Sequence, residues 1–112
     1  MYAKYVKERE GLEEIKTDRG FIHFKIKNGI GWINDIYILP EFRKDGHATF
    51  LANQVFELCK ERGVKEVGCQ SDERANGHDL SKTAIENFGF ELYHKSGDLN
   101  YYKMEVSEWE KQ

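Results

Sequence analysis

A short loop between an apolar strand and an amphipathic helix holds the residues best suited to bind an anion. It spans residues 43–48, shortly after Pro40, and reads RKDGHA. Backbone amides at the start of a helix have no intrahelical acceptor, and the aligned peptide dipoles attract negative charge to that end. Gly46 and Ala48 are small, so a phosphate group can come close to the main chain. The loop is therefore a candidate phosphate site, although tight strand-to-helix turns with glycine also serve structural roles.

The spacing Arg43-x-x-Gly46-x-Ala48 resembles the Arg/Gln-x-x-Gly-x-Gly/Ala signature of the GNAT N-acetyltransferase superfamily. In that family the loop amides hold the pyrophosphate of acetyl-coenzyme A (acetyl-CoA). The preceding strand, which IYILPEF resembles, pairs its main chain with the pantetheine arm. The resemblance implies that the cofactor is bound by the following residues of this segment: Ile38, Leu39, Arg43, Lys44, Asp45, Gly46, His47 and Ala48.

A second segment, KEVGCQSDERANGHDLSKTAIENFGFE, resembles the Ser-Asp, Asn and helix-Gly-Phe-Glu pattern of aminoglycoside 6′-N-acetyltransferases. In those enzymes the Asp after the fifth strand holds or deprotonates the cationic acceptor, and the Asn contacts the cofactor or orders the loop. The matching positions here are Asp72 and Asn76. The residues alone also allow structural roles, because Asp commonly caps the amides of its own turn and Asn-Gly is itself a turn signal.

The strand before the loop carries a second acidic candidate, Asp35. It occupies a position where polyamine and aminoglycoside acetyltransferases often have acidic residues, so the resemblance makes it an acceptor anchor. A structural carboxylate is the alternative. Successive strand residues point to opposite faces of a sheet, so at most one of Asn34 and Asp35 faces a given cleft.

One position departs from the family pattern. The family commonly has a Tyr four residues before the Gly of the closing Gly-Phe pair, as general acid for the leaving thiolate, and this chain has Ile85 there. Tyr93, Tyr101 or Tyr102 could substitute, although such residues are typical of sheets. Loss of the acid need not abolish activity, since general acid catalysis contributes about 10²–10⁴-fold.

Hydrophobic periodicity predicts the elements that must position these residues. Alternating patterns predict strands over residues 2–6, 14–18, 21–27, 30–39, 64–70, 90–94 and 100–106. A helical period predicts helices over residues 46–62 and 79–89, the second capped by Asp79. The charged residues 8–14 suit one helical turn or a bend.

The order of strands, helix, strand, helix and hairpin predicts a mixed sheet in an α/β fold. The helix after the strand at 30–39 makes the strand at 64–70 parallel to it. This order resembles the GNAT acyl-CoA N-acyltransferase fold without most of its first two helices, which form one wall of the acceptor site in the family. We expect one domain over residues 1–112, with a loose tail over residues 107–112.

Composition argues against several classes of protein. A net charge of −3 without a basic stripe argues against a nucleic-acid partner. No apolar run reaches the roughly 20 residues that span a membrane. Cys59 and Cys69 lie in apolar patterns, which indicates buried free thiols and a cytoplasmic location. The four His residues have no ligand spacing, so we expect no metal.

The leading hypothesis is an enzyme that transfers acetyl from acetyl-CoA directly to a primary amine, with Asp72 and Asp35 as acceptor anchors. The acceptor could be a small amine, an aminoglycoside-like sugar or a protein amine. We expect a small cationic molecule, because a mildly acidic protein tolerates a cation better than an anion. Phe50 or Trp109, if exposed, could serve a homodimer interface. The alternative is a non-catalytic acetyl-CoA-binding or protein-interaction module on the same fold. Release of free thiol in the presence of amines separates the two.

Overall fold

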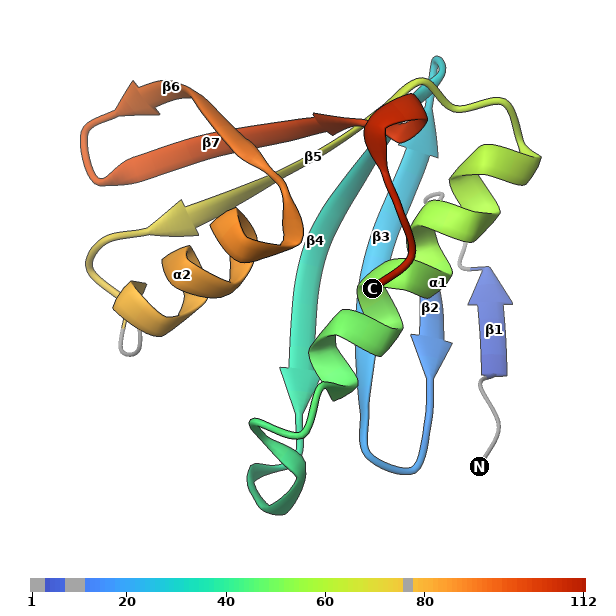
Figure 1. The fold of residues 1–112 in the computed structure, drawn as a ribbon, viewed down its shortest axis with the longest axis horizontal. Coiled ribbons are helices and arrows are strands. Elements are labelled where there is room, and N and C mark those ends of the chain that lie inside the picture. The colour runs from blue at the N-terminus through green and yellow to red at the C-terminus, as the bar shows by residue number, and fades with distance from the viewer. Residues whose placement is uncertain (1–3, 8–11, 76–77) are drawn as a thin grey trace.

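Seven strands form one mixed sheet in the described part of the chain, and two α-helices connect its parts (Figure 1). The computed structural model describes residues 4–7, 12–75 and 78–112. The strands are β1 (Lys4–Lys7), β2 (Leu12–Lys16), β3 (Gly20–Lys27), β4 (Ile30–Ile38), β5 (Glu66–Asp72), β6 (Glu91–Ser96) and β7 (Leu99–Glu105). Their spatial order is β1-β2-β3-β4-β5-β7-β6. The helices are α1 (His47–Glu61) and α2 (His78–Phe88), with 3-10 turns η1 (Pro40–Phe42) and η2 (Val106–Glu108).

β4 and β5 pair over a short distance and then diverge, so that the sheet opens into a fork (Figure 1). Their parallel pairing runs from Ile30 opposite Glu66 to Trp32 opposite Gly68. Gly68 lets this junction close, because a Cβ there would lie 2.7 Å from the Trp32 indole. Beyond the junction β4 stays paired with β3, and β5 stays paired with β7. The facing edges of β4 and β5 therefore have no strand partner among the described residues.

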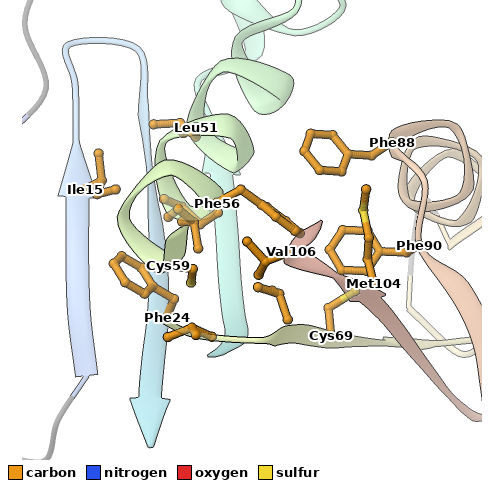
Figure 2. Packing of buried hydrophobic residues seen from close by; sticks show 14 of the residues in the cluster. Ile15, Phe24, Leu51, Phe56, Cys59, Cys69, Phe88, Phe90, Met104 and Val106 are labelled. Carbon is orange, nitrogen blue, oxygen red and sulfur yellow. The ribbon is translucent and has the colours of Figure 1, made fainter. Parts of the chain in front are cut away.

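One face of the sheet carries both helices and the hydrophobic core (Figure 2). The ring centroids of Phe56 in α1 and Phe88 at the end of α2 lie 5.3 Å apart, so both helices pack over the same core. The apolar residues of α1 recur with a helical period and form one buried stripe. This stripe consists of Leu51, Val55, Phe56 and Cys59.

The opposite face of the sheet, called the open face below, carries neither of the two described helices. Side chains alternate along β3, so that Ile22 and Phe24 are buried toward the helices while Phe21 and His23 lie half-buried on the open face. The strand register extends this face across the junction to Trp32.

The C-terminal tail packs against the protein, whereas a loose tail was expected over residues 107–112. Trp109 Nε1 donates to Asn53 Oδ1 at 3.0 Å. Gln112 Nε2 donates to the Phe88 carbonyl at 2.6 Å. The tail therefore covers the region between α1 and α2, as Figure 1 shows at the C-terminus.

Three further expectations about the elements change in the structure. Residues 12–14, expected to form a turn or bend, belong to β2. Asp72 is the last residue of β5 rather than a loop residue. Phe50 is not a free exposed aromatic, because it is half-buried and stacks on His47 with ring centroids 5.2 Å apart. No helix in the described ranges is long and apolar enough to cross a membrane.

Candidate functional site

The loop of residues 43–48 leaves a set of backbone amides open at the start of α1. Gly46 precedes the helix with φ +87°, and its carbonyl accepts the first helical bond from the Phe50 amide at 3.0 Å. Within the described chain, the amides of residues 44–49 have no acceptor, and no side chain caps the helix. A Cβ built on Gly46 would meet no atom within 4 Å. Gly46 therefore borders open space, and residues 43–48 are exposed apart from His47, as an anion site requires. The amides of residues 44–49 are called the amide cradle below.

A buried contact holds the amide cradle against the turn between β2 and β3. His47 is buried, and its Nε2 lies 2.6 Å from Thr17 Oγ1. Burial and the nearby positive charge of Arg19 lower the pKa of His47, so its imidazole is neutral at pH 7. The side chain of His47 is therefore structural, and the backbone amide is what His47 can offer to a cofactor.

Arg19, on the same turn, adds a positive charge beside the amide cradle. Its Nη1 lies 3.7 Å from Asp45 Oδ2, and its guanidinium lies 4.9 Å from the centre of the Phe42 ring. Sequence reasoning missed Arg19 and Thr17 because both lie on a turn far from the loop in sequence. No local pattern identifies them, since the pairing of β2, β3 and β4 brings them here.

The end of β4 and the loop share several contacts. Arg43 Nε donates to the Ile38 carbonyl at 2.9 Å, and the guanidinium lies over the Tyr37 ring at 5.5 Å. Lys44 is exposed and has φ +72°. The Leu39 amide donates to a carbonyl of the β2–β3 turn at 2.8 Å. This amide is therefore already used within the protein, and we expect main-chain pairing with pantetheine to fall earlier on β4.

β4 carries a bulge at Asn34. Phe24 lies opposite Ile33 and His23 lies opposite Asp35, so Asn34 is the extra residue. The side chains from Asn34 to Tyr37 are exposed, and only the last residue of the strand, Ile38, is buried again. The bulge breaks the regular alternation assumed from the sequence, and the register places Asp35 on the open face beside His23. Bulges are common next to active sites, where they redirect a strand edge.

Comparison with known proteins identifies the family. The profile of the Acetyltransferase (GNAT) family matches residues 12–81, from β2 into α2. This chain belongs to the GNAT acetyltransferase family. The match includes the amide cradle, the bulge and the junction of the fork.

Solved structures of other proteins share the fold of this GNAT chain. PaiA N-acetyltransferase from Thermoplasma acidophilum, in complex with coenzyme A, superposes with a TM-score of 0.74 at 16% identity over 84% of this chain. Ard1 from Thermoplasma volcanium gives 0.69 at 17% identity over 87% of this chain and 71% of its own. Nourseothricin acetyltransferase superposes with a TM-score of 0.69 at 20% identity, over 85% of this chain and 64% of its own. This chain spans 59% of the length of PaiA. No curated protein matches it.

Asp72 lies at the end of β5, on the other arm of the fork from Asp35. The register places both carboxylates of this GNAT protein on the open face. Asp72 Oδ1 accepts the Arg74 amide at 2.9 Å, and the Arg74 guanidinium binds the same carboxylate through Nε at 3.1 Å and Nη2 at 2.9 Å. The turn-capping role is therefore present. The Arg74 side chain is 70% exposed, so this ion pair is weak, and the anchor role of Asp72 stays a prediction.

The position of the family's general acid is apolar in this protein. Ile85 lies in α2 and packs against the core. Among its possible substitutes, Tyr102 is fully buried, and its hydroxyl has no hydrogen-bond partner in the described part of the protein. Tyr93 is exposed at the edge strand β6. Tyr101 lies on the open face, with its ring centroid 6.5 Å from that of Trp32 at the junction. An acid role for any of them stays a prediction.

Two other features of this GNAT protein bear on the site. Asn76, predicted to contact the cofactor, lies outside the described residues. A surface hollow of about 340 Å³ lies between the end of α2 and the C-terminal tail, and none of its lining residues is a predicted site residue. Over the described ranges, no group of three His, Cys, Asp or Glu side chains is placed to hold a metal ion.

Proposed function

We propose that this protein is an N-acetyltransferase that moves the acetyl group of acetyl-CoA directly to a primary amine. The amide cradle carries this proposal, because its amides have no acceptor among the described residues and border open space at Gly46. A diphosphate fits such a site, since its oxygens accept hydrogen bonds and carry negative charge. Membership of the GNAT family supports a coenzyme A thioester as the source of that diphosphate.

The proposed path of acetyl-CoA follows the free edge of β4. Arg43, Lys44 and Arg19 would surround the diphosphate with positive charge, which strengthens hydrogen bonds to phosphate. The backbone of β4 beyond the junction would pair with the pantetheine arm in the way that an added strand pairs with a sheet edge. This path leads toward the bulge at Asn34, where the fork gives access from the open face.

The proposed acceptor is a small cationic molecule, such as a polyamine or an aminoglycoside-like sugar. Asp35 and Asp72 present carboxylates on the open face, one on each arm of the fork. Charge-assisted hydrogen bonds from ammonium groups to carboxylates are stronger than neutral ones. The net charge of −3 also favours the approach of a cation. Recognition would therefore depend on side-chain charge rather than on an apolar pocket.

Direct transfer requires a neutral amine. An alkyl ammonium group has a pKa near about 10, so its proton must leave before the nitrogen can attack the thioester carbonyl. The nitrogen–carbon bond then forms, and the carbon–sulfur bond breaks to release coenzyme A as thiolate. The buried thiols cannot serve as an acyl carrier, because burial raises the pKa of Cys59 to about 11 and that of Cys69 to about 12. Such protected free thiols also fit a reducing cytoplasm.

A non-catalytic acetyl-CoA-binding or interaction module is the second candidate. The side chain of Ile85 favours it, because the position of the family's general acid is used for core packing. A thiolate is nevertheless a tolerable leaving group, and the open face offers carboxylates for an amine. We therefore rank the enzyme first.

Two measurements test the proposal. Isothermal titration calorimetry with coenzyme A tests the amide cradle. Release of free thiol from acetyl-CoA, measured over a panel of polyamines and aminoglycosides, tests the transfer. We expect both binding and turnover. Binding without turnover across the panel favours the module, and the absence of binding refutes both candidates.

A further inference from the structure

Three side chains form a row across β2, β3 and β4 on the open face. Glu14 lies opposite His23 in the β2–β3 register, and His23 lies opposite Asp35 in the β3–β4 register. Glu14 Oε2 and His23 Nε2 are 2.7 Å apart. The side chains of His23 and Glu14 are 23% and 25% exposed, so solvent and small molecules can reach them.

The contact with Glu14 defines which nitrogen of His23 can act as a base. An ionised carboxylate only accepts hydrogen bonds, so the Nε2 atom of His23 must carry a proton and donate it. In the neutral imidazole the lone pair is then on Nδ1. The Phe21 ring stacks on the imidazole at a centroid distance of 4.5 Å and helps to hold its orientation. This arrangement presents an oriented imidazole rather than a freely rotating side chain.

The row ends beside the bulge of β4. Asp35 follows Asn34 directly, on the strand edge that has no partner beyond Trp32 in the described structure. His23 is one strand further from that edge. An amine held by Asp35 would therefore lie close to His23, either in direct contact or separated by one water molecule.

We propose that His23 is the general base that deprotonates the amine acceptor, with Glu14 as a positioning residue. The inference rests on the proposed acetyl transfer. Nδ1 of His23 takes one proton from the ammonium group held by Asp35, and the neutral nitrogen attacks the thioester carbonyl. Collapse of the adduct breaks the carbon–sulfur bond, and the second proton of the amine ends on the coenzyme A thiolate. His23 returns its proton to solvent, so the reaction releases one proton overall.

A structural role is the competing explanation for this row. A half-buried pair of Glu14 and His23 with only a structural role would contribute to stability and nothing to the reaction. Kinetics separates the two roles when folding and cofactor binding are measured on the same variants.

The decisive variant is His23→Gln, because its amide can still donate to Glu14 but cannot take a proton. His94→Gln is the matched control, since His94 is an exposed open-face imidazole on β6 whose ring lies against a different ring, that of Tyr101, in a tilted contact. We expect kcat to fall about 10²–10⁴-fold in His23→Gln and to stay unchanged in His94→Gln. Affinity for coenzyme A, measured by calorimetry, should stay the same in both variants.

The role of Glu14 needs a readout that packing alone would not change. In ¹⁵N NMR spectra of the protein with a neutral His23 imidazole, we expect the Nε2-protonated tautomer in the wild type. In Glu14→Ala we expect His23 to lose its preference for that tautomer. Glu14→Ala should also lower kcat about tenfold, which is a smaller loss than the one expected in His23→Gln. An unchanged tautomer and rate in Glu14→Ala would refute the positioning role.

The outcomes separate this inference from the proposed function. If the wild type acetylates an amine and His23→Gln does so equally fast, His23 is not the base, while the acetyltransferase proposal stands. If the wild type binds coenzyme A and acetylates no amine in the panel, both fall. If imidazole added to His23→Ala restores turnover, the activity lost in that variant was lost because the base is missing.

Discussion

Placing a negative charge in the amide cradle should weaken coenzyme A binding selectively. Gly46 is the position to change, because its φ of +87° marks the loop conformation and a Cβ there meets no atom within 4 Å. Gly46→Asp therefore adds a carboxylate without a steric clash inside the protein. It also adds backbone strain of about 1–2 kcal/mol, because side chains disfavour this conformation.

The size of the binding effect follows from Coulomb's law. A unit charge about 6 Å from a phosphate charge, at an effective dielectric constant of about 20, is repelled by about 3 kcal/mol. Solvent and salt at this exposed loop reduce that value by about half. We therefore expect the Kd for coenzyme A to rise about tenfold at low salt, and to rise less at high salt.

The matched control is Gly63→Asp. Gly63 has φ +72° and also has no atom within 4 Å of a built Cβ, but it follows α1 instead of preceding it. Both variants should lose stability in thermal melts, and Gly63→Asp should lose more, because a carboxylate is favourable at the start of a helix and unfavourable at its end. Gly46→Ala adds the backbone strain without the charge, so it separates the effect of strain from the effect of charge on binding. Equal calorimetric affinity of Gly46→Asp and Gly63→Asp for coenzyme A would refute the amide cradle as the diphosphate site.

Three further predictions concern stability. His47 has a lowered pKa in the folded protein, so around and below pH 6.5 the unfolded chain binds more protons, and stability falls with decreasing pH. Urea unfolding should therefore give a smaller free energy of unfolding at pH 5.5 than at pH 7.5, and His47→Gln should remove this part of the difference. Tyr102→Phe removes a buried hydroxyl without a partner in the described structure, so the free energy of unfolding should rise by up to about 1 kcal/mol, and a large loss of kcat instead would identify Tyr102 as the missing acid. Gly68→Ala places a Cβ 2.7 Å from the Trp32 indole and should destabilise the protein by about 1–3 kcal/mol in the same assay, whereas an unchanged midpoint would show that the junction of the fork can adjust.

The parts of the fold that could be predicted from sequence are those set by local patterns. The alternation around Phe24 indicates a strand, and the helical spacing from Leu51 to Cys59 indicates α1. The amide cradle was also predictable, because it depends on a contiguous loop with Gly46 at its centre. Local chemistry alone was enough for these features.

The parts that could not be predicted depend on pairing between distant segments. The bulge at Asn34 exists only relative to the register of β3, and the fork exists only because β5 leaves β4 after Gly68. The contact between His47 and Thr17 likewise requires the β2–β3 turn to meet the start of α1. A single sequence contains no local signal for such contacts, so periodicity assigned Asp35 to a strand without showing its neighbours.

The two sides of the proposed site therefore depend on different kinds of interaction. On the proposed cofactor side, backbone amides would bind the diphosphate, and most side-chain changes leave those amides in place. On the proposed acceptor side, recognition would depend on side chains such as Asp35 and His23, which lie on the open face outside the core cluster. Substitutions away from a core usually change stability by less than about 0.5 kcal/mol. If the proposed function is right, a few open-face substitutions would therefore change which amine is accepted and leave the amide cradle unaltered.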